Sequence, residues 1–284
     1  MFILAVLSAT PHAYAQREIK PATQLIQRLR EKFPDYFDSI MSDPRFGFFD
    51  MRVITKPVAR EENPPEIIPR RKIKVVSYGY VTNRWSQTEG TRFLETNAEV
   101  LARAEDQLKV SKEATAAIFD IETQFGKIKG DYLVFKTFFT IAVFKPNIVS
   151  KGWAEKELLV FLTICKQNHW DPLSIKGSRR GAFGIPQFEP SSYPSLAMHY
   201  DGTRCVGYKE SSLPPDLYEK KDATCSTMNY LRAAGFGPSS KTQLRAFLRY
   251  NHSLSYARAC QRAAALWSTP KIRRTILLSQ AARH

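Results

Sequence analysis

The stretch that decides the fold is residues 111–126, which read SKEATAAIFDIETQFG. Ser111 is a good helix N-cap, and Glu113 lies in the first turn, where the helix dipole favours a negative charge. Apolar residues then recur at helical spacing, at Ala114, Ala117, Ile118, Ile121 and Phe125. The pattern predicts an amphipathic helix over 112–125 that packs its apolar face into a core.

Glu122 is the candidate catalytic residue of this helix. It lies four residues after Ile118 and three before Phe125, so it projects from the apolar face, whereas Asp120 points elsewhere. Apolar surroundings disfavour the charged form of a carboxylate and raise its pKa, and such a group can hold a proton near neutral pH and donate it to a leaving oxygen. The alternative is a glutamate that pairs with a buried arginine or caps a backbone.

Outward from this helix, the chain predicts a mainly α fold. Helical spacing recurs over 21–33, 88–109, 132–144, 153–169, 190–199, 216–234, 241–250 and 253–267. Strand signals are sparse, and only the alternating run 73–76 suggests a short strand. We therefore expect a helical core over 85–267, a smaller irregular N-terminal lobe over 16–84 and a basic tail over 268–284, which together form one catalytic domain.

The N-terminus predicts export. Residues 2–9 form a short apolar run, and Ala13-Tyr14-Ala15 suits signal-peptidase cleavage after Ala15. The run is too short to span a bilayer, and no cysteine that could carry a lipid precedes Cys165. We expect residues 1–15 to be a signal peptide and the protein to be periplasmic or secreted, without stable membrane insertion.

The four cysteines fit an oxidising compartment. Cys205 and Cys225 flank a polar, proline-containing segment, where a disulfide would close a loop. Cys165 and Cys260 lie in helical patterns and could pair or be buried thiols. Four cysteines allow three pairings, and the sequence leaves the choice open. Because C-x-x-C and H-E-x-x-H are absent, we expect no metal and no cofactor.

The net charge of +15, from 42 Lys and Arg against 27 Asp and Glu, indicates a polyanionic partner. Nucleic acid, an anionic membrane and the carboxylate-rich peptides of bacterial cell wall would all satisfy it. Nucleic acid ranks last, because the basic residues are scattered and no readout motif is present.

Three segments resemble the membrane-bound lytic transglycosylase B family, a branch of the lysozyme-like enzymes that cleave glycans. They are residues 119–126 (FDIETQFG), residues 171–193 (DPLSIKGSRRGAFGIPQFEPSSY) and residues 248–257 (LRYNHSLSYA). Their order and spacing also agree, and weaker similarity extends over residues 23–267. The resemblance implies a lysozyme-like helical fold and a peptidoglycan substrate, and we expect a monomer.

The resemblance makes Glu122 the catalytic acid and base and places Tyr250 and Asn251 near it. The chemistry of the side chains themselves suggests further substrate contacts. Gln187 can donate and accept hydrogen bonds, and Ser178 and Ser192 carry small hydroxyls. The rings of Phe183, Phe188, Tyr193 and Tyr250 could stack on sugars or belong to the core.

The implied reaction needs one carboxyl group. Glu122 would protonate the bridging oxygen between N-acetylmuramic acid and N-acetylglucosamine, the substrate's N-acetyl group would stabilise the anomeric carbon, and the 6-hydroxyl would close a 1,6-anhydro ring. A hydrolytic lysozyme on the same fold is the alternative, with de-N-acetylated glycan as its possible substrate. A wall-binding scaffold without catalysis is the alternative of another class.

The chain also departs from the family pattern. Glu189 stands where an apolar residue is usual, Ile185-Pro186 replaces an aromatic–glycine pair, and Gln124 and Lys136 replace Arg and Asp. Glu189 could be a second carboxylate that activates water or binds an ammonium group. Alternatively, it is a solvated glutamate at a helix N-terminus.

Overall fold

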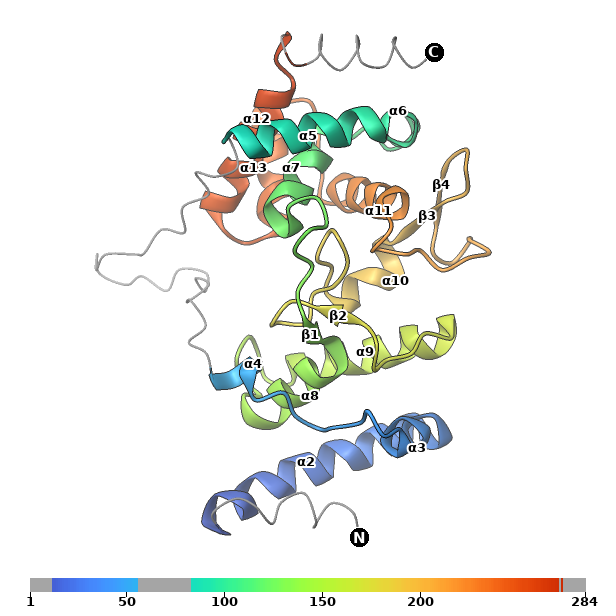
Figure 1. Cartoon of the computed structure of the whole chain (residues 1–284), viewed down its shortest axis with the longest axis vertical. Coiled ribbons are helices and arrows are strands. Elements are labelled where there is room, and N and C mark those ends of the chain that lie inside the picture. The colour runs from blue at the N-terminus through green and yellow to red at the C-terminus, as the bar shows by residue number, and fades with distance from the viewer. Residues whose placement is uncertain (1–11, 56–82, 271, 273–284) are drawn as a thin grey trace, which may run out of the picture. The chain divides into compact units, whose positions relative to one another are not determined.

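The computed structural model describes residues 12–55, 83–270 and 272, with side chains from residue 20 onward (Figure 1). The chain forms two compact units that interleave along the sequence. The first combines residues 1–58, 130–182 and 189–191, and the second combines residues 59–129, 183–188 and 192–284. Each unit is helical, which confirms the predicted mainly α class. The predicted lobe boundaries at residues 84 and 267 stay predictions.

The first unit is built around two helices, α8 (Val134–Phe144) and α9 (Trp153–Asn168). Its other elements are α2 (His12–Lys32), α3 (Pro34–Ser42), α4 (Arg52–Thr55) and the antiparallel pair β1 (Tyr132–Leu133) and β2 (Lys176–Gly177). Leu25, Ile26 and Leu29 of α2 are buried, as the predicted amphipathic helix requires. The rings of Phe135 and Phe139 stack at the centre of this core.

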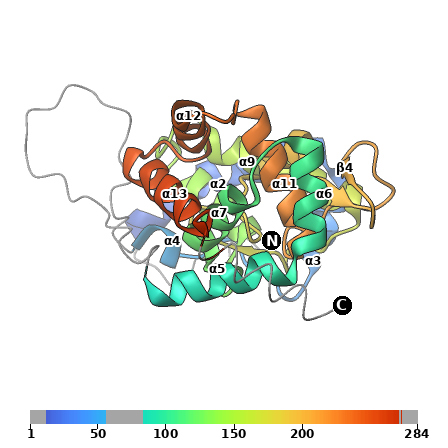
Figure 2. The same ribbon diagram turned by 90° about the horizontal axis from the view of Figure 1, so that it is seen from above.

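The second unit is organised around α7 (Lys112–Thr123), which packs against α13 (Leu254–Trp267) and α5 (Arg84–Thr96). The remaining helices are α6 (Ala98–Leu108), α10 (Tyr193–Leu196), α11 (Lys220–Ala233) and α12 (Ser240–Tyr250). A short hairpin joins β3 (Met198–Tyr200) to β4 (Cys205–Gly207). Figure 2 shows α7 between α5 and α13.

Two predicted helices are wrong in part. The helix predicted over 88–109 breaks at Asn97, whose side-chain amide donates to the carbonyl of Phe93 at 2.9 Å and competes with the backbone of the helix. The helix predicted over 190–199 is a 3-10 turn at Pro190–Ser192, then α10, then β3. At its end Ala197 is extended, with φ −68° and ψ 140°.

Other predictions fall outside the described residues. The strand at 73–76 lies in the segment 56–82, and most of the predicted signal peptide lies in residues 1–11. Between residues 43 and 55, which were predicted to be irregular, the structure adds only the single turn of α4. No helix in the described ranges has both the length and the apolar character needed to cross a bilayer.

A disulfide joins Cys205 of β4 to Cys225 of α11, with Cα atoms 5.6 Å apart. These are the two cysteines that flank the polar, proline-containing segment, where the sequence suggested a disulfide. Closing a loop of this size stabilises the folded state by about 3 kcal/mol. Cys165 and Cys260 do not pair with each other; both are buried free thiols, which was the other possibility left open by the sequence. Burial raises the pKa of both thiols, so both stay protonated.

Candidate active site

The last turn of α7 places Glu122 at the end of the central helix of the second unit. Ser111 caps the helix as predicted, accepting a hydrogen bond from the amide of Ala114 at 3.3 Å. The helix ends because Gln124 and Phe125 both adopt the left-handed conformation, with φ of 51° and 57°. Phe125 then packs its ring against Phe93. Glu122 is half-buried, consistent with its predicted place on the apolar side of the helix.

Tyr256 of α13 holds the carboxyl group of Glu122. Its hydroxyl donates to Oε1 of Glu122 at 2.7 Å. The Tyr256 ring is only 1% exposed. Burial, and next the charge of Glu122, raise the pKa of Tyr256 well above its usual value, so the phenol remains a donor. This hydrogen bond fixes the orientation of the carboxyl group.

The groups that surround Glu122 are weak acids that stay neutral. Burial first and the negative charge of Glu122 second raise the pKa of the Tyr250 phenol and of the Cys260 thiol. Neither group therefore competes with Glu122 for negative charge near neutral pH.

The second motif meets the first through backbone hydrogen bonds. The hydroxyl of Thr123, next to Glu122, donates to the carbonyl of Ile185 at 2.9 Å. Gln187 has a φ of 54°, and its side-chain amide donates to the carbonyls of Gly184 at 2.9 Å and of Lys129 at 3.2 Å. Gln187 therefore closes the loop beside the end of α7.

The third motif joins the second through Tyr250. Its hydroxyl donates to the carbonyl of Pro186 at 2.6 Å, and its ring lies 4.5 Å from that of Tyr230. Asn251 caps the C-terminus of α12 with a backbone bond to Phe247 at 3.0 Å. The loop 184–187 is thus bonded both to the end of α7, through Thr123, and to the end of α12, through Tyr250, whose phenol feels the charge of Glu122. Asn251 follows Tyr250 at the end of α12, and its role as a substrate contact stays a prediction.

Some predicted contacts are core residues. Tyr193 is fully buried, and its hydroxyl donates to the carbonyl of Pro215 at 2.6 Å, so its ring has no exposed surface for a sugar. Phe183 and Phe188 are buried too and form a short antiparallel bridge. Ser192 precedes α10 as its N-cap residue, with no capping bond from its side chain.

Two predicted contacts belong to the first unit. The hydroxyl of Ser178 accepts from the amides of Arg180 at 3.3 Å and Ala182 at 3.2 Å, and so closes a tight turn. A side chain at Gly181, which has a φ of 87°, would come within 2.3 Å of the Phe138 ring, so only glycine fits this turn. Glu189 is exposed at the start of the turn Pro190–Ser192.

Tyr256 is the residue that sequence reasoning did not single out. It belongs to the third motif but was read only as part of the matching segment. It is the third residue of α13, in the first turn after the N-cap Ser253, and its hydroxyl reaches Glu122 of α7. The sequence feature that could have predicted this role is the place of Tyr256 in the third motif, one short loop after Tyr250.

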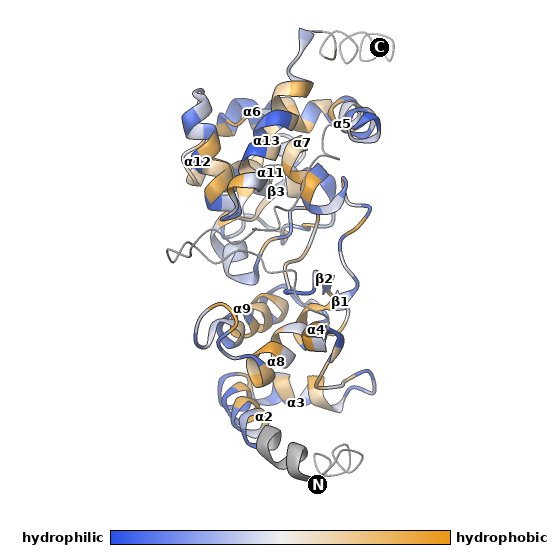
Figure 3. Ribbon diagram, turned by 90° about the vertical axis from the view of Figure 1, so that its left-hand side faces the viewer, coloured by the Kyte–Doolittle hydropathy of each residue, from blue (hydrophilic) through white to orange (hydrophobic). Residues whose placement is uncertain are grey.

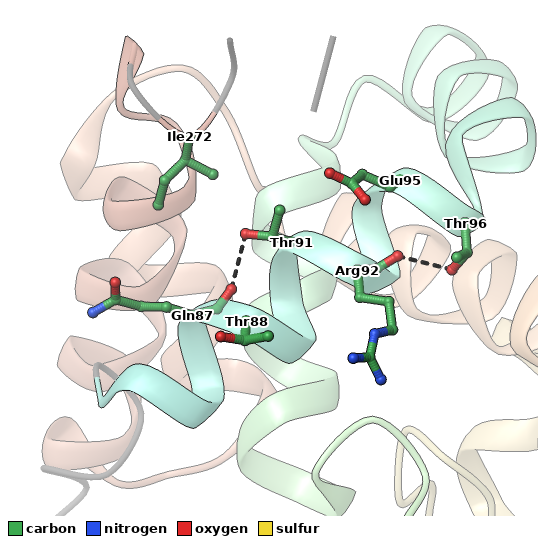
Figure 4. Close-up of a pocket in the computed structure, with 7 residues that line it drawn as sticks. All are labelled: Gln87, Thr88, Thr91, Arg92, Glu95, Thr96 and Ile272. Atoms are coloured by element: carbon green, nitrogen blue, oxygen red, sulfur yellow. Dashed lines mark hydrogen bonds between the residues drawn. The ribbon is translucent and has the colours of Figure 1, made fainter. Parts of the chain in front are cut away.

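A surface cavity of about 550 Å³ lies along α5, as Figure 4 shows. It is lined by Gln87, Thr88, Thr91, Arg92, Glu95, Thr96 and Ile272. The hydroxyls of Thr91 and Thr96 donate to carbonyls of their own helix, at 2.8 and 2.9 Å. No residue of the three motifs lines it, so this cavity is not the site built around Glu122.

The family described as the transglycosylase SLT domain matches residues 49–275. The chain belongs to this family.

The relatives of this transglycosylase-domain protein agree. It is 29% identical over 147 residues to the membrane-bound lytic murein transglycosylase B of Escherichia coli strain K12, and the match spans 52% of this chain but 38% of that relative. The soluble lytic transglycosylase SltB1 of Pseudomonas aeruginosa shares the fold, with a TM-score of 0.69 and 21% identity over 89% of this chain and 98% of that one.

A second solved structure also shares the fold. SltB3 of Pseudomonas aeruginosa, in complex with NAG-anhNAM-pentapeptide, has a TM-score of 0.64 and 20% identity, and the match covers 86% of this chain and 78% of that one. These likenesses confirm the lysozyme-like helical fold predicted for the chain.

Asp120 is a second buried carboxyl group in the first motif, and it faces α5 rather than Tyr256. It accepts a hydrogen bond from the hydroxyl of Ser86 through Oδ2, while Oδ1 is buried and has no partner among the described residues. Burial raises the pKa of Asp120 to about 6, against the lowering effect of Ser86. The ionised form is therefore penalised in the folded state.

We expect Asp120→Asn to stabilise the protein at pH 7.5 and not at pH 4. Because the pKa of Asp120 in the folded state lies above that in the unfolded state, stability falls as the pH rises through about 4 to 6 and stays low above it. Asparagine does not ionise, so the variant avoids this loss in the free energy of unfolding. We expect the gain at pH 7.5 to be about 1 to 2 kcal/mol after allowing for solvent screening. Thermal unfolding at both pH values measures it. An equal effect of the substitution at pH 4 and pH 7.5 would contradict the assignment.

Proposed function

We propose that the protein cleaves the β-1,4 bond between N-acetylmuramic acid and N-acetylglucosamine in peptidoglycan and forms 1,6-anhydromuramoyl ends. The observation that carries the proposal is the half-buried carboxyl group of Glu122, held by Tyr256 where the three motifs meet. Support comes from the family match over residues 49–275 and from relatives named as lytic transglycosylases.

In the proposed reaction, protonated Glu122 gives its proton to the bridging oxygen, and the bond between that oxygen and the muramoyl anomeric carbon breaks. The N-acetyl group of the substrate stabilises the positive carbon. Glu122, now ionised, takes the proton of the 6-hydroxyl, whose oxygen attacks the anomeric carbon. No water is consumed, and Glu122 ends protonated, so one carboxyl group serves as acid and then base.

Two roles support Glu122 within this chain. Tyr256 donates to Oε1 and keeps the carboxyl group in one orientation through both proton transfers. Tyr250 is held in place by its hydrogen bond to the carbonyl of Pro186 and by its contact with the Tyr230 ring. We propose that its ring forms a rigid side of the site next to Glu122. We propose Tyr250 and Asn251 as substrate contacts by the resemblance, and Gln187, Ser178 and Ser192 from the hydrogen-bonding capacity of their side chains. Glu189 remains the candidate second carboxylate.

Product masses test the reaction. We expect fragments of purified peptidoglycan to carry anhydro ends, whose mass is about 18 Da, one water, below that of hydrolysed ends. Digestion of fully acetylated peptidoglycan followed by mass spectrometry gives the answer. Hydrolysed ends would instead assign the protein as a lysozyme that uses the same Glu122, and a substrate stripped of N-acetyl groups should resist the anhydro route.

We also propose that the protein is exported to the periplasm or beyond the cell. The disulfide between Cys205 and Cys225 is the structural support, because such bonds persist in oxidising compartments. The predicted signal peptide over residues 1–15 and the membrane-bound relative agree with it. Detection of a mature chain that starts at Gln16 in an exported fraction would test it.

A further inference from the structure

The last part of the chain carries charge of one sign only. After Asp222 no Asp or Glu occurs up to residue 284. The described part of this segment, residues 223–270 and 272, has its basic side chains exposed, at Arg232, Lys241, Arg245, Arg249, Arg258 and Arg262. The positive net charge of the protein is therefore concentrated here by the absence of acidic residues.

Five of these exposed residues lie on the two neighbouring helices α12 and α13, and we call them the basic face: Lys241, Arg245, Arg249, Arg258 and Arg262. On α12 the basic residues recur every fourth position, so they lie along one line of the helix. α12 and α13 pack against each other, and the side-chain amide of Gln261 donates to the carbonyl of Ser240 at 2.7 Å. The start of α12, next to Lys241, therefore lies beside the part of α13 that carries Arg262. Figures 2 and 3 show the two helices as neighbours, and the hydropathy colours of Figure 3 show hydrophilic residues on both.

No carboxylate of the described residues pairs with the basic face. None of its five members forms a salt bridge there, and Arg249 instead donates to the carbonyl of Ala234 at 3.0 Å. By contrast, on α6 Arg103 pairs with Glu99. Like charges held side by side repel, so this surface gains from an anionic partner.

The surroundings of the basic face favour a polymer over a bilayer. A helix that lies on a membrane needs an exposed apolar side. The apolar sides of α12 and α13 are buried in the core, as Phe247 and Trp267 show, and Leu254 is the one large apolar side chain exposed on the described part of the two helices. The same two helices carry Tyr250 and Tyr256, so the basic face belongs to the helices that also contribute to the surroundings of Glu122.

We propose that the basic face binds the carboxylates of the short peptides attached to peptidoglycan strands and so holds the enzyme on its polymer between cleavages. The identity of the polymer rests on the proposed function. Arginine forms paired hydrogen bonds with carboxylates, and a row of such contacts is strong at low salt and weakens as salt screens it. The basic face does not have to bind one particular peptide, because its arginines can release one carboxylate and bind the next one along the strand.

Sedimentation with insoluble peptidoglycan tests the proposal. The starting protein carries Glu122→Gln, so that it binds without digesting the polymer. One variant adds four changes on the basic face, Lys241→Gln, Arg245→Gln, Arg258→Gln and Arg262→Gln. A matched control adds four on exposed lysines of the first unit, Lys32→Gln, Lys145→Gln, Lys151→Gln and Lys156→Gln.

We expect the basic-face variant to bind about tenfold or more weakly at low salt, with a flatter dependence on salt, and the control to change less than about threefold. Peptidoglycan whose carboxylates have been converted to neutral amides should bind the starting protein as weakly as untreated polymer binds the basic-face variant. Equal losses in the two variants would show a general charge effect and overturn the proposal.

Two other results would also overturn it. One is unchanged binding after amidation, and the other is tighter binding to phosphatidylglycerol vesicles or to duplex DNA than to peptidoglycan. Failure of the proposed function looks different, because the protein with Glu122 intact would then bind peptidoglycan without releasing fragments. Circular dichroism of each variant confirms that the helices are retained.

Discussion

Glu122→Gln is expected to lower the rate of peptidoglycan cleavage by a factor on the order of 10³ or more while the fold and wall binding survive. Glutamine keeps the size of the side chain and can still accept the hydrogen bond from Tyr256, which measures 2.7 Å. It cannot supply a proton to the bridging oxygen or take one from the 6-hydroxyl. The measurement is release of soluble fragments from labelled peptidoglycan under substrate excess.

Tyr256→Phe is the matched control for orientation. It deletes the hydroxyl that donates to Oε1 of Glu122 and keeps the ring in the core. We expect the rate to fall by about tenfold to a hundredfold, because one hydrogen bond to a charged group contributes about 1.5 to 3 kcal/mol. If Glu122→Gln kept a tenth or more of the activity, another group would be the acid. If the protein with Glu122 intact bound the wall but released nothing, the scaffold alternative would stand.

The first motif was predictable because its chemistry is local. An N-cap, an apolar side at helical spacing and a glutamate on that side are all written between Ser111 and Phe125, and the structure places α7 there. The role of Tyr256 was not local in this sense. Its contact with Glu122 joins residues 134 positions apart, so only the packing of α13 on α7 reveals it.

The hairpin β3–β4, in contrast, could not be predicted from the local sequence. Each strand has three residues, too few for an alternating pattern, and the first strand overlaps the helix predicted over 190–199. Tertiary contacts define it instead. The buried carboxylate of Asp222 accepts from the amide of Tyr200 at 2.8 Å, and the disulfide ties Cys205 to α11. Neither partner is close in sequence.

Gly90→Ala should lower the free energy of unfolding by about 3 kcal/mol, the upper end of the usual cost of overpacking. In an ordinary helix the same change stabilises by about 1 kcal/mol, because alanine has the higher helix propensity. Here a Cβ atom on Gly90 would lie 2.2 Å from Cε2 and Cζ2 of Trp267. Trp267 is fully buried with its ring edge-on to Phe125, so neither ring has room to move. Chemical denaturation measures the loss.

Gly207→Ala is the control for this prediction, since a Cβ atom there meets nothing within 4 Å. It should change the free energy of unfolding by less than about 0.5 kcal/mol. Trp267→Leu will itself destabilise the core, but it removes the ring that blocks Gly90. In that background Gly90→Ala should cost markedly less, because the two positions are in contact and their effects are not additive.

A Gly90→Ala protein that unfolds at higher denaturant than the parent would refute this packing of α5 on α13. The substitution should also disturb the active site. Trp267 packs on Phe125, and Phe125 lies in the left-handed turn that ends α7 directly after Glu122 and Thr123. A displaced ring therefore shifts the segment that aims the carboxyl group, and we expect the surviving folded Gly90→Ala protein to cleave more slowly than its unfolding alone explains.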